Sequence, residues 1–486
     1  MRSTSVFCKL KAMHSNHFPN IKTSSHLAKI SYLMLLSAAL LVGCQTVPDT
    51  KVMIENANPD NQDLAIKGIE ENYSTEHVDK TLNKLAETEE DVALLEKQLK
   101  ITQGITNQAL ISGNETQLLF DGEQTFKAVF DAIGNAKKHI NLEYFIFENI
   151  KYRWTTLEAL LLKKRAQGVA IHIIYDAYGS LYTDKAFLQR LKDAGIKLTE
   201  YHSIDLESIN DINHRDHRKM LIVDGKVAIV GGVNLSVTYQ SKSLFGSSGG
   251  SEAPKNAQEA YWRDTDLLIN GPAVAELQKL FLEHWDTNQP IDQTDFFPQQ
   301  VKAGNQYIHV IGSSPKDDKH YFYATLVAAI SNAAKKIVMN SAYFVPTQEQ
   351  KSALIDAAKR GVMVELILPG LSDSTMSINV QRSHYEDLLE AGINIYEMDA
   401  AVLHAKTISV DDVWSVVGSS NFDYRSATLN AEVDVVVLGK KTAKQLDAKF
   451  AKDKRKARKI KLEAWKQRPF TDKVKERFSR TVEKLL

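Results

Sequence analysis

Cysteine is scarce in this chain, and no apolar run in it is long enough to span a bilayer comfortably. Two cysteines, Cys8 and Cys44, stand among 486 residues, which excludes a disulfide framework and a cysteine-based metal site. The apolar segment 30–43 has only fourteen residues without a charge, whereas a transmembrane helix needs about 20. Net charge is lacking as well, because 60 basic residues balance 60 acidic ones.

Acidic residues are missing from the first 43 positions, which carry five Lys or Arg. Basic residues followed by the apolar segment 30–43 are typical of a signal peptide. The segment ends in Leu41-Val42-Gly43-Cys44, which resembles the lipobox of bacterial lipoproteins. This resemblance implies cleavage before Cys44 and acylation of its thiol; an uncleaved signal anchor is the alternative. Because Gln45 follows the cysteine, we expect anchorage in the outer membrane of a Gram-negative bacterium, facing the periplasm.

Charge is also uneven at the other end of the chain. Residues 449–486 hold 15 basic and 5 acidic residues, interleaved with Trp465, Phe470 and Phe478. This composition suits an anionic lipid surface, with a solvated lysine-rich helix as the alternative. Near the N-terminus, 45–75 is polar without a period and predicts a tether of low order. Apolar residues at helical spacing predict one or two amphipathic helices over 75–106.

One motif occurs twice, 187 residues apart. Counting from each His, a Lys follows at +2, an Asp at +7, a Gly at +14 and an Asn at +17. The first copy comprises His217, Lys219, Asp224 and Asn234, and the second comprises His404, Lys406, Asp411 and Asn421. Five matching positions, counting the His itself, indicate an internal duplication rather than a coincidence.

The surroundings of the two motifs repeat in the same order. Strand-like segments alternate with helical ones from about residue 110, and 335–346 matches the segment that starts at 137. This alternation predicts two duplicated α/β sandwich domains packed about a pseudo-two-fold axis. We divide the chain into a signal peptide (1–43), a tether with amphipathic helices (44–109), two similar domains (110–300 and 301–445) and a basic tail (446–486).

The repeated residue types suit the chemistry of a phosphodiester. Side chains at i and i+2 of a strand share a face, so His217 and Lys219 project together and Arg218 faces away. Two imidazoles, two ammonium groups and two Asn amides could stabilise the charge of a phosphoryl transition state. One neutral His can attack phosphorus while the other, protonated, gives a proton to the leaving oxygen. This chemistry needs no cofactor, and no carboxylate–histidine cluster has metal-ligand spacing.

Each His needs a partner that fixes its tautomer. Asp264 follows the first motif and Glu432 the second, and their segments align as acid-x-Asp before apolar residues. We expect each acid to serve the His of its own copy. The separation in sequence from His217 to Asp264 is longer than that from His404 to Glu432, and the Gly/Ser-rich insertion 241–260 accounts for the difference. The composition of this insertion predicts a mobile loop. We group Asp224 and Asp411 with the catalytic motif and expect turn or hydrogen-bonding roles in preference to proton transfer.

The two HxKxxxxD motifs, each followed by Gly-x-x-Asn, resemble the phospholipase D superfamily over about 110–440. Segments 261–274, 340–346 and 403–433 are similar to the bacterial cardiolipin synthase group. The resemblance implies a phosphohistidine on His217, acid/base catalysis by His404, and phosphate binding by the motif Lys and Asn residues. Ser419 matches the family's hydroxyl, whereas the first copy has Gly232 there, so one oxyanion contact is missing from that half.

The resemblance therefore implies a phosphatidyltransferase acting on phosphatidylglycerol, phosphatidylethanolamine or cardiolipin. The phosphatidyl group would pass to a lipid hydroxyl, making cardiolipin, or to water, as in a phospholipase D hydrolase. A nuclease is disfavoured because the basic tail carries apolar residues and no stacking module is evident. A catalytically silent membrane-binding protein is the remote alternative. It is disfavoured because both motifs are intact. We expect the lipid anchor and the basic tail to hold the protein on a membrane.

Overall fold

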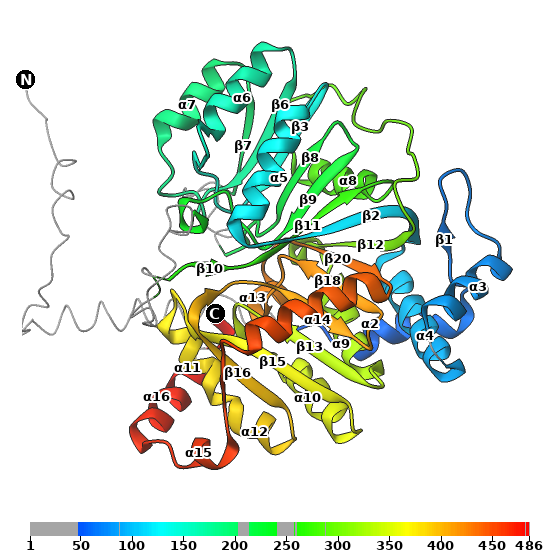
Figure 1. Ribbon diagram of the computed structural model, residues 1–486, viewed down its shortest axis with the longest axis vertical. Coiled ribbons are helices and arrows are strands. Elements are labelled where there is room, and N and C mark those ends of the chain that lie inside the picture. Colours follow the sequence, from blue (N-terminus) through cyan, green and yellow to red (C-terminus); the bar gives the residue numbers. More distant parts are fainter. Residues whose placement is uncertain are drawn as a thin grey trace, which may run out of the picture. The chain divides into compact units, whose positions relative to one another are not determined.

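The structure is a computed structural model that describes residues 47–486 apart from 87, 203–212, 241–256, 258–259, 287, 482 and 486 (Figure 1). The predicted signal peptide, Cys44 and nearly all of the Gly/Ser-rich insertion lie outside the described residues. Among the helices in the described ranges, none is both long and apolar enough to cross a membrane.

The first half of the duplicated region is built on a seven-stranded arrangement. Its strands are β2 (Leu110–Phe120), β3 (His139–Tyr144), β6 (Ala170–Asp176), β7 (Lys197–Tyr201), β8 (Lys219–Val223), β9 (Val227–Gly231) and β11 (Thr265–Asn270). Their pairings give the order β2-β11-β9-β8-β3-β6-β7. The helices are α5 (Asp121–Asn135), α6 (Leu157–Ala166), α7 (Lys185–Asp193) and α8 (Val274–His284).

The second half repeats this order strand for strand. Its strands are β12 (Gln306–Ser313), β13 (Lys336–Asn340), β15 (Met363–Leu371), β16 (Asn394–Leu403), β17 (Thr407–Val410), β18 (Trp414–Gly418) and β20 (Glu432–Leu438). They pair in the order β12-β20-β18-β17-β13-β15-β16. The helices are α9 (Tyr321–Asn332), α10 (Gln348–Lys359), α11 (Thr375–Ser383), α12 (Tyr385–Glu390), α13 (Tyr424–Thr428) and α14 (Lys440–Lys454). The predicted duplicated α/β fold is confirmed.

The two halves join through their equivalent first strands. β2 and β12 pair antiparallel, with Ile111 opposite Ile308, and this relation between equivalent strands is that of a local two-fold axis. Apolar residues from both halves fill one common cluster, which includes Ile111, Val230 and Val435. Burial of this shared cluster stabilises the halves against each other and fixes the two motifs relative to each other.

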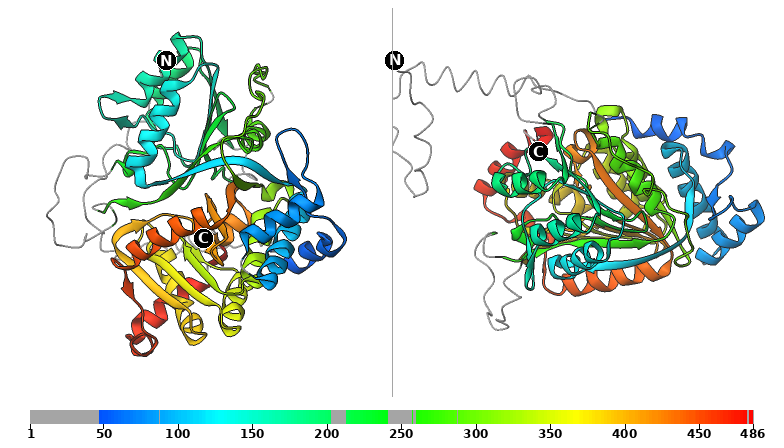
Figure 2. Two further views of the ribbon diagram at one scale, coloured as in Figure 1. Left: turned by 45° about the vertical axis from the view of Figure 1, so that its right-hand side comes forward. Right: turned by 90° about the horizontal axis from the view of Figure 1, so that it is seen from above.

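The polar segment before the duplicated region is folded, so the predicted low-order tether is wrong. It forms α2 (Thr50–Asn56), a short turn η1 (Pro59–Asn61) and β1 (Ile66–Lys67), which pairs parallel with β2. Ile66 is completely buried, so a few apolar side chains suffice to anchor a segment that shows no period. The predicted amphipathic helices are α3 (Thr75–Leu85) and α4 (Glu89–Thr106), and Figure 2 shows the blue N-terminal helices beside the second half, where α2 and α4 contact α9.

The basic tail begins later than predicted. α14 runs through the expected boundary at 445–446 and buries Leu446 and Phe450 against the second half. Beyond it, β21 (Arg458–Lys459) pairs with β16. α15 (Leu462–Lys466) and α16 (Phe470–Arg480) then lie against α12 and α11 (Figure 1). The apolar residues of α14 sit at helical spacing, and that pattern marks a packed helix rather than a separate tail.

Candidate active site

The two motifs occupy equivalent places in the two sheets. His217 precedes β8, which Lys219 begins, and His404 and Lys406 lie in the short link between β16 and β17. His217 and His404 are 9% and 6% exposed. Burial, then Lys219 and then Lys406, hold the pKa of His217 well below its usual range. Lys406 belongs to the other half, so the two motifs form one electrostatic unit.

Backbone pairing between the halves brings the motifs together. The His217 amide donates to the Ala431 carbonyl at 2.9 Å, next to the start of β20. The His404 amide donates to the Arg263 carbonyl at 2.8 Å, next to the start of β11. Arg263 ends the short strand β10 (Trp262–Arg263), which pairs parallel with the end of β16. The backbone of each histidine is therefore hydrogen-bonded to residues just before a strand of the opposite half.

The histidine–acid pairs are crossed between the halves. His217 Nδ1 lies 2.9 Å from Glu432 Oε2, and His404 Nδ1 lies 2.7 Å from Asp264 Oδ2. The expectation that each acid serves the histidine of its own copy is wrong. The crossed backbone pairs place each acid beside the other copy's histidine. With Nδ1 held by a carboxylate, Nε2 is the ring nitrogen left for reaction.

The pKa values of the two acids are shifted in opposite directions although both acids are fully buried. Burial raises the pKa of Glu432 to about 7, against the opposing influence of Lys219. Burial also pushes the pKa of Asp264 upward, but His404 and Lys406 hold it below its usual value. Asp264 is therefore ionised at neutral pH and can stabilise an imidazolium on His404.

Both motif lysines are buried next to their histidines. Lys219 Nζ donates to the His217 carbonyl at 2.6 Å and lies 5.2 Å from the centre of the Phe145 ring. Lys406 Nζ donates to the His404 carbonyl at 2.5 Å and lies 3.1 Å from His404 Nε2. Burial lowers the pKa of Lys219 to about 7 and that of Lys406 to about 8. An anionic substrate would favour their charged forms.

The two asparagines are also buried at the site. The Asn234 side-chain oxygen accepts from the Ile146 amide at 3.1 Å, which leaves its NH₂ group as a donor. The Asn421 side-chain oxygen is buried and makes no hydrogen bond within the described part of the chain. A buried polar atom of this kind is costly unless water or a ligand pairs with it. The phosphate-binding roles of Asn234 and Asn421 stay predictions that fit these positions.

Ser419 holds an acid in place. Its hydroxyl donates to Glu432, the partner of His217, and accepts from the Val433 amide at 3.0 Å. At the equivalent place Gly232 leaves no room for a side chain, because a Cβ there would lie 2.2 Å from Asp264 Oδ1. The contrast between Ser419 and Gly232 therefore concerns how each acid is supported.

Tyr239 is a site residue that was not predicted. It closes the short turn η2 (Val237–Tyr239), and its buried hydroxyl lies 2.8 Å from His404 Nδ1, beside Asp264. Tyr239 is at +22 from His217, and Ser426 is at +22 from His404. The Ser426 hydroxyl donates to Glu432 at 2.8 Å. Extending the comparison of the two copies by five residues beyond each Asn would have found this hydroxyl pair.

Asp224 and Asp411 lie outside the catalytic cluster. Asp224 has φ 53° at the β8–β9 turn and accepts from the amides of Lys137, Lys138 and His139 at 2.7–3.0 Å. Asp411 repeats this arrangement with 334–336 at 2.7–2.8 Å. Five residues of strand separate Lys219 from Asp224, about 16 Å at the usual rise. Asp224 and Asp411 are therefore turn residues that accept backbone hydrogen bonds, and their grouping with the catalytic residues is corrected. Of the roles expected for them, the structure supports the structural one and not proton transfer.

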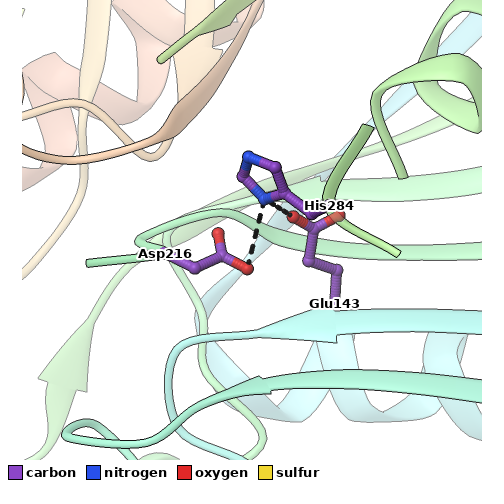
Figure 3. A group of neighbouring side chains, drawn as sticks. All are labelled: Glu143, Asp216 and His284. Carbon is purple, nitrogen blue, oxygen red and sulfur yellow. Dashed lines mark hydrogen bonds and ion pairs between the residues drawn. The ribbon is translucent and has the colours of Figure 1, made fainter. Parts of the chain in front are cut away.

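A buried charged cluster lies behind the first motif (Figure 3). Within the described residues, Glu143, Asp216 and His284 form the one group whose ligand atoms, all within 4.8 Å of one another, could hold a metal ion. His284 Nδ1 lies 2.7 Å from Glu143 and 3.6 Å from Asp216. The fully buried Arg218 guanidinium is 3.8 Å from Glu143. Burial raises the pKa of Glu143 to about 8, and Arg218 and His284 lie beside the two acids, so the side chains of the cluster offset its charge.

Arg218 connects this cluster to the site, because it also donates to the Glu432 carbonyl at 3.3 Å. Its guanidinium contacts the Leu280 carbonyl and Glu143, whereas the His217 ring contacts the Glu432 carboxylate.

Comparisons with known proteins agree with this arrangement. Residues 129–243 and 326–454 match the family model "Cardiolipin synthase, PLD-like domain". Cardiolipin synthase of Geobacillus kaustophilus is 33% identical over 393 residues, which cover 80% of this chain and 76% of that protein. Cardiolipin synthase 1 of Bacillus anthracis is 32% identical over 382 residues, covering 76% of this chain and 72% of that protein.

A solved structure shares the fold. Phosphatidylserine synthase of Haemophilus influenzae superposes with a TM-score of 0.59 at 13% identity, covering 80% of this chain and 100% of the other. At that identity the likeness concerns the fold alone. The sequence match over both halves, with a motif in each, shows that the chain belongs to the cardiolipin synthase family of proteins with phospholipase D-like domains.

Proposed function

We propose that this protein is a phosphatidyltransferase of the phospholipase D and cardiolipin synthase type. The observation that carries the proposal is the crossed site, in which two buried histidines from two halves each hold a carboxylate on Nδ1. Two buried lysines beside them supply positive charge for one phosphodiester group. The relatives named above carry the name cardiolipin synthase, which agrees with this chemistry.

In the first step His217 Nε2 attacks phosphorus of a phosphatidyl lipid, and the bond from phosphorus to the head-group oxygen breaks. His404, carrying a proton on Nε2, gives it to that oxygen, so the head-group alcohol leaves. The low pKa of His217 supports the nucleophile's role, since an unprotonated ring has a free electron pair. Burial and then Lys406 lower the pKa of His404 as well, and the Asp264 carboxylate opposes that shift, which supports the role of acid.

In the second step an acceptor hydroxyl attacks the phosphohistidine and gives its proton to His404. The bond from phosphorus to His217 breaks and the enzyme is restored. A phosphatidylglycerol hydroxyl as acceptor gives cardiolipin, and water gives phosphatidic acid. Lys219, Lys406 and the amide groups of Asn234 and Asn421 hold the phosphate oxygens in both steps.

The membrane is the place of this reaction in our proposal. An acylated Cys44 anchors the mature chain in the outer membrane on its periplasmic side, and the basic tail meets anionic lipid. In support, Phe470 and Phe478 on α16 are 78% and 71% exposed, and Val474 between them is half exposed. Residues spaced by four lie on one face of a helix, and such an apolar stripe beside lysines and arginines suits a lipid surface.

The test is a transfer assay with purified protein and radiolabelled phosphatidylglycerol, with or without phosphatidylethanolamine, followed by separation of the lipids. We expect labelled cardiolipin or phosphatidic acid from the wild type and neither from His217→Ala or His404→Ala. Cardiolipin identifies a lipid acceptor and phosphatidic acid identifies water. Cleavage of single-stranded DNA with the lipids left intact would contradict the proposal.

A further inference from the structure

Several large apolar side chains of the first half are exposed to solvent, and we call five of them the aromatic rim. They are Trp154 (96% exposed), Tyr182 (93%), Tyr178 (61%), Val237 (54%) and Leu181 (48%). Single exposed apolar residues are ordinary, but a group of them gathered in one place marks an interaction surface. The question is therefore whether the five lie together and what they surround.

Topology places the aromatic rim at the edge of the first sheet where the catalytic His217 enters. β3 runs antiparallel to β8 with Tyr144 opposite Lys219, so the chain after Tyr144 leaves the sheet beside His217. β6 is parallel to β3 and ends at the same edge, just before Tyr178. β9 is antiparallel to β8 and also ends there, shortly before Val237.

Hydrogen bonds fasten these connections to one another. Thr183, next to Tyr182, donates to the Phe147 carbonyl at 3.0 Å, and the Phe147 amide donates to Ser180 at 3.1 Å. The Val237 amide donates to Glu148 at 2.8 Å. Gln240 contacts the carbonyl of Lys151 in the hairpin that carries Trp154. The rim is therefore a connected rigid border.

Residues next to the rim in the same connections contact the catalytic histidines. The Phe145 ring, two residues before Phe147, lies 5.2 Å from the His217 ring. Tyr239, two residues after Val237, contacts His404. A substrate that reaches the two histidines from this edge passes the rim.

The chemistry of the rim identifies its partner. Trp154 stands at the tip of the hairpin formed by β4 (Lys151–Tyr152) and β5 (Thr155–Thr156), in the sequence Lys-Tyr-Arg-Trp. Lys151 and Arg153, the basic residues of this hairpin, are also exposed. Trp and Tyr favour the boundary between lipid head groups and acyl chains, and Lys and Arg favour lipid phosphates.

We propose that the aromatic rim inserts into the head-group layer of an anionic phospholipid bilayer and seats the mouth of the active site on it. The proposal rests on the proposed function, because a lipid substrate must leave a bilayer to reach buried histidines. It goes beyond the anchor and the basic tail, since it assigns contact to loops of the first half.

A spectroscopic experiment tests the contact itself. Full-length protein is mixed with vesicles of phosphatidylethanolamine and phosphatidylglycerol whose acyl chains carry bromine, which quenches nearby tryptophan. Trp154 is the one tryptophan among the large exposed apolar residues of the described chain. We expect quenching in the wild type and its loss in Trp154→Phe. Equal quenching in both proteins, or none in the wild type, would overturn the proposal. A rim that served a protein partner instead of a bilayer would give one of these results.

A kinetic experiment separates contact from chemistry. The variant Trp154→Ser/Tyr182→Ser is assayed on vesicles and on a short-chain phosphatidylglycerol dissolved as monomers. We expect at least a tenfold loss of kcat/KM on vesicles and unchanged kcat/KM on monomers. The matched control is Met363→Ser, which changes an exposed residue at the start of β15, the sheet edge away from the catalytic residues.

The outcomes of this assay keep the two proposals apart. An equal loss on both substrates, or no loss on either, would refute the rim as a membrane contact. A wild-type protein that acts on neither substrate would count against the proposed function. The quenching measurement would in that case still test whether the rim contacts the membrane.

Discussion

At the scale of single residues, the site contains two histidine–acid pairs, and different hydroxyl groups support the acid or the histidine in each pair. Glu432 receives hydrogen bonds from Ser419 and Ser426. Asp264 has no serine at the equivalent place, because Gly232 packs directly against it. The Tyr239 hydroxyl instead contacts His404 Nδ1, the ring nitrogen that Asp264 also holds. The orientation of the pair formed by His404 and Asp264 therefore depends on Tyr239 and on the Thr265 amide, which donates to Asp264 at 2.8 Å.

Substitution of Tyr239 tests this dependence. Tyr239→Phe removes one hydrogen bond within a charged pair, which is worth about 1.5–3 kcal/mol, so we expect kcat to fall about 10- to 100-fold. The pH dependence of kcat should shift as well, because the hydroxyl contacts Nδ1 of the same imidazole whose Nε2 exchanges the proton. Tyr307→Phe is the control, because it removes a tyrosine hydroxyl that bonds to Thr81 and not to a motif residue. An unchanged kcat and pH profile in Tyr239→Phe would show that the hydroxyl has no positioning role.

The two lysines predict how substrate binding depends on pH. Burial lowers the pKa of Lys219 to about 7 and that of Lys406 to about 8, so both are charged below pH 7 and lose their protons as the pH rises. Binding of the phosphate anion needs the charged forms. We therefore expect KM to increase about tenfold or more between pH 6 and pH 9.

Lys219→Arg provides the control for this pH series. The guanidinium stays charged over the whole range, so KM should depend less on pH in this variant than in the wild type. A wild-type KM that is constant up to pH 9 would mean that the lysines stay protonated in the site and that their burial does not govern binding.

At the scale of elements, the motif Asp residues hold strands and helices rather than substrate. Asp224 binds three successive amides at the start of β3, and Asp411 does the same at β13. Each fixes the turn after a motif strand to the neighbouring antiparallel strand. The position of the histidine at the far end of that strand follows from this attachment.

Asp224→Ala leaves these amides without their acceptor. We expect the free energy of unfolding to fall by about 1–3 kcal/mol, measured by urea denaturation followed by circular dichroism. Asp79→Ala, at an exposed position of α3, is the comparison and should change stability little. If Asp224→Ala abolished transfer in a protein of unchanged stability, Asp224 would have to act in the chemistry after all.

At the scale of the whole molecule, the repeat in the sequence predicted the duplicated fold, because matching offsets in two copies require matching strands. The same repeat could not predict the crossed pairs. His404 and Asp264 meet only because β10 of one half pairs with β16 of the other, and that contact leaves no local pattern. The folded segment around Ile66 was not predicted for a related reason, since the strand that it pairs with, β2, comes more than 40 residues later in the chain.

The central claim is that the two halves form one catalytic site, and a kinetic comparison of three variants tests it most directly. The rate of phosphatidyl transfer is measured for His217→Ala, His404→Ala and the double variant. Residues that act as a unit are non-additive, so we expect each single substitution to lower kcat by about a thousandfold or more, with little further loss in the double variant. If each single variant kept about half of the wild-type rate and only the double variant were inactive, the halves would be independent sites and the account would be wrong.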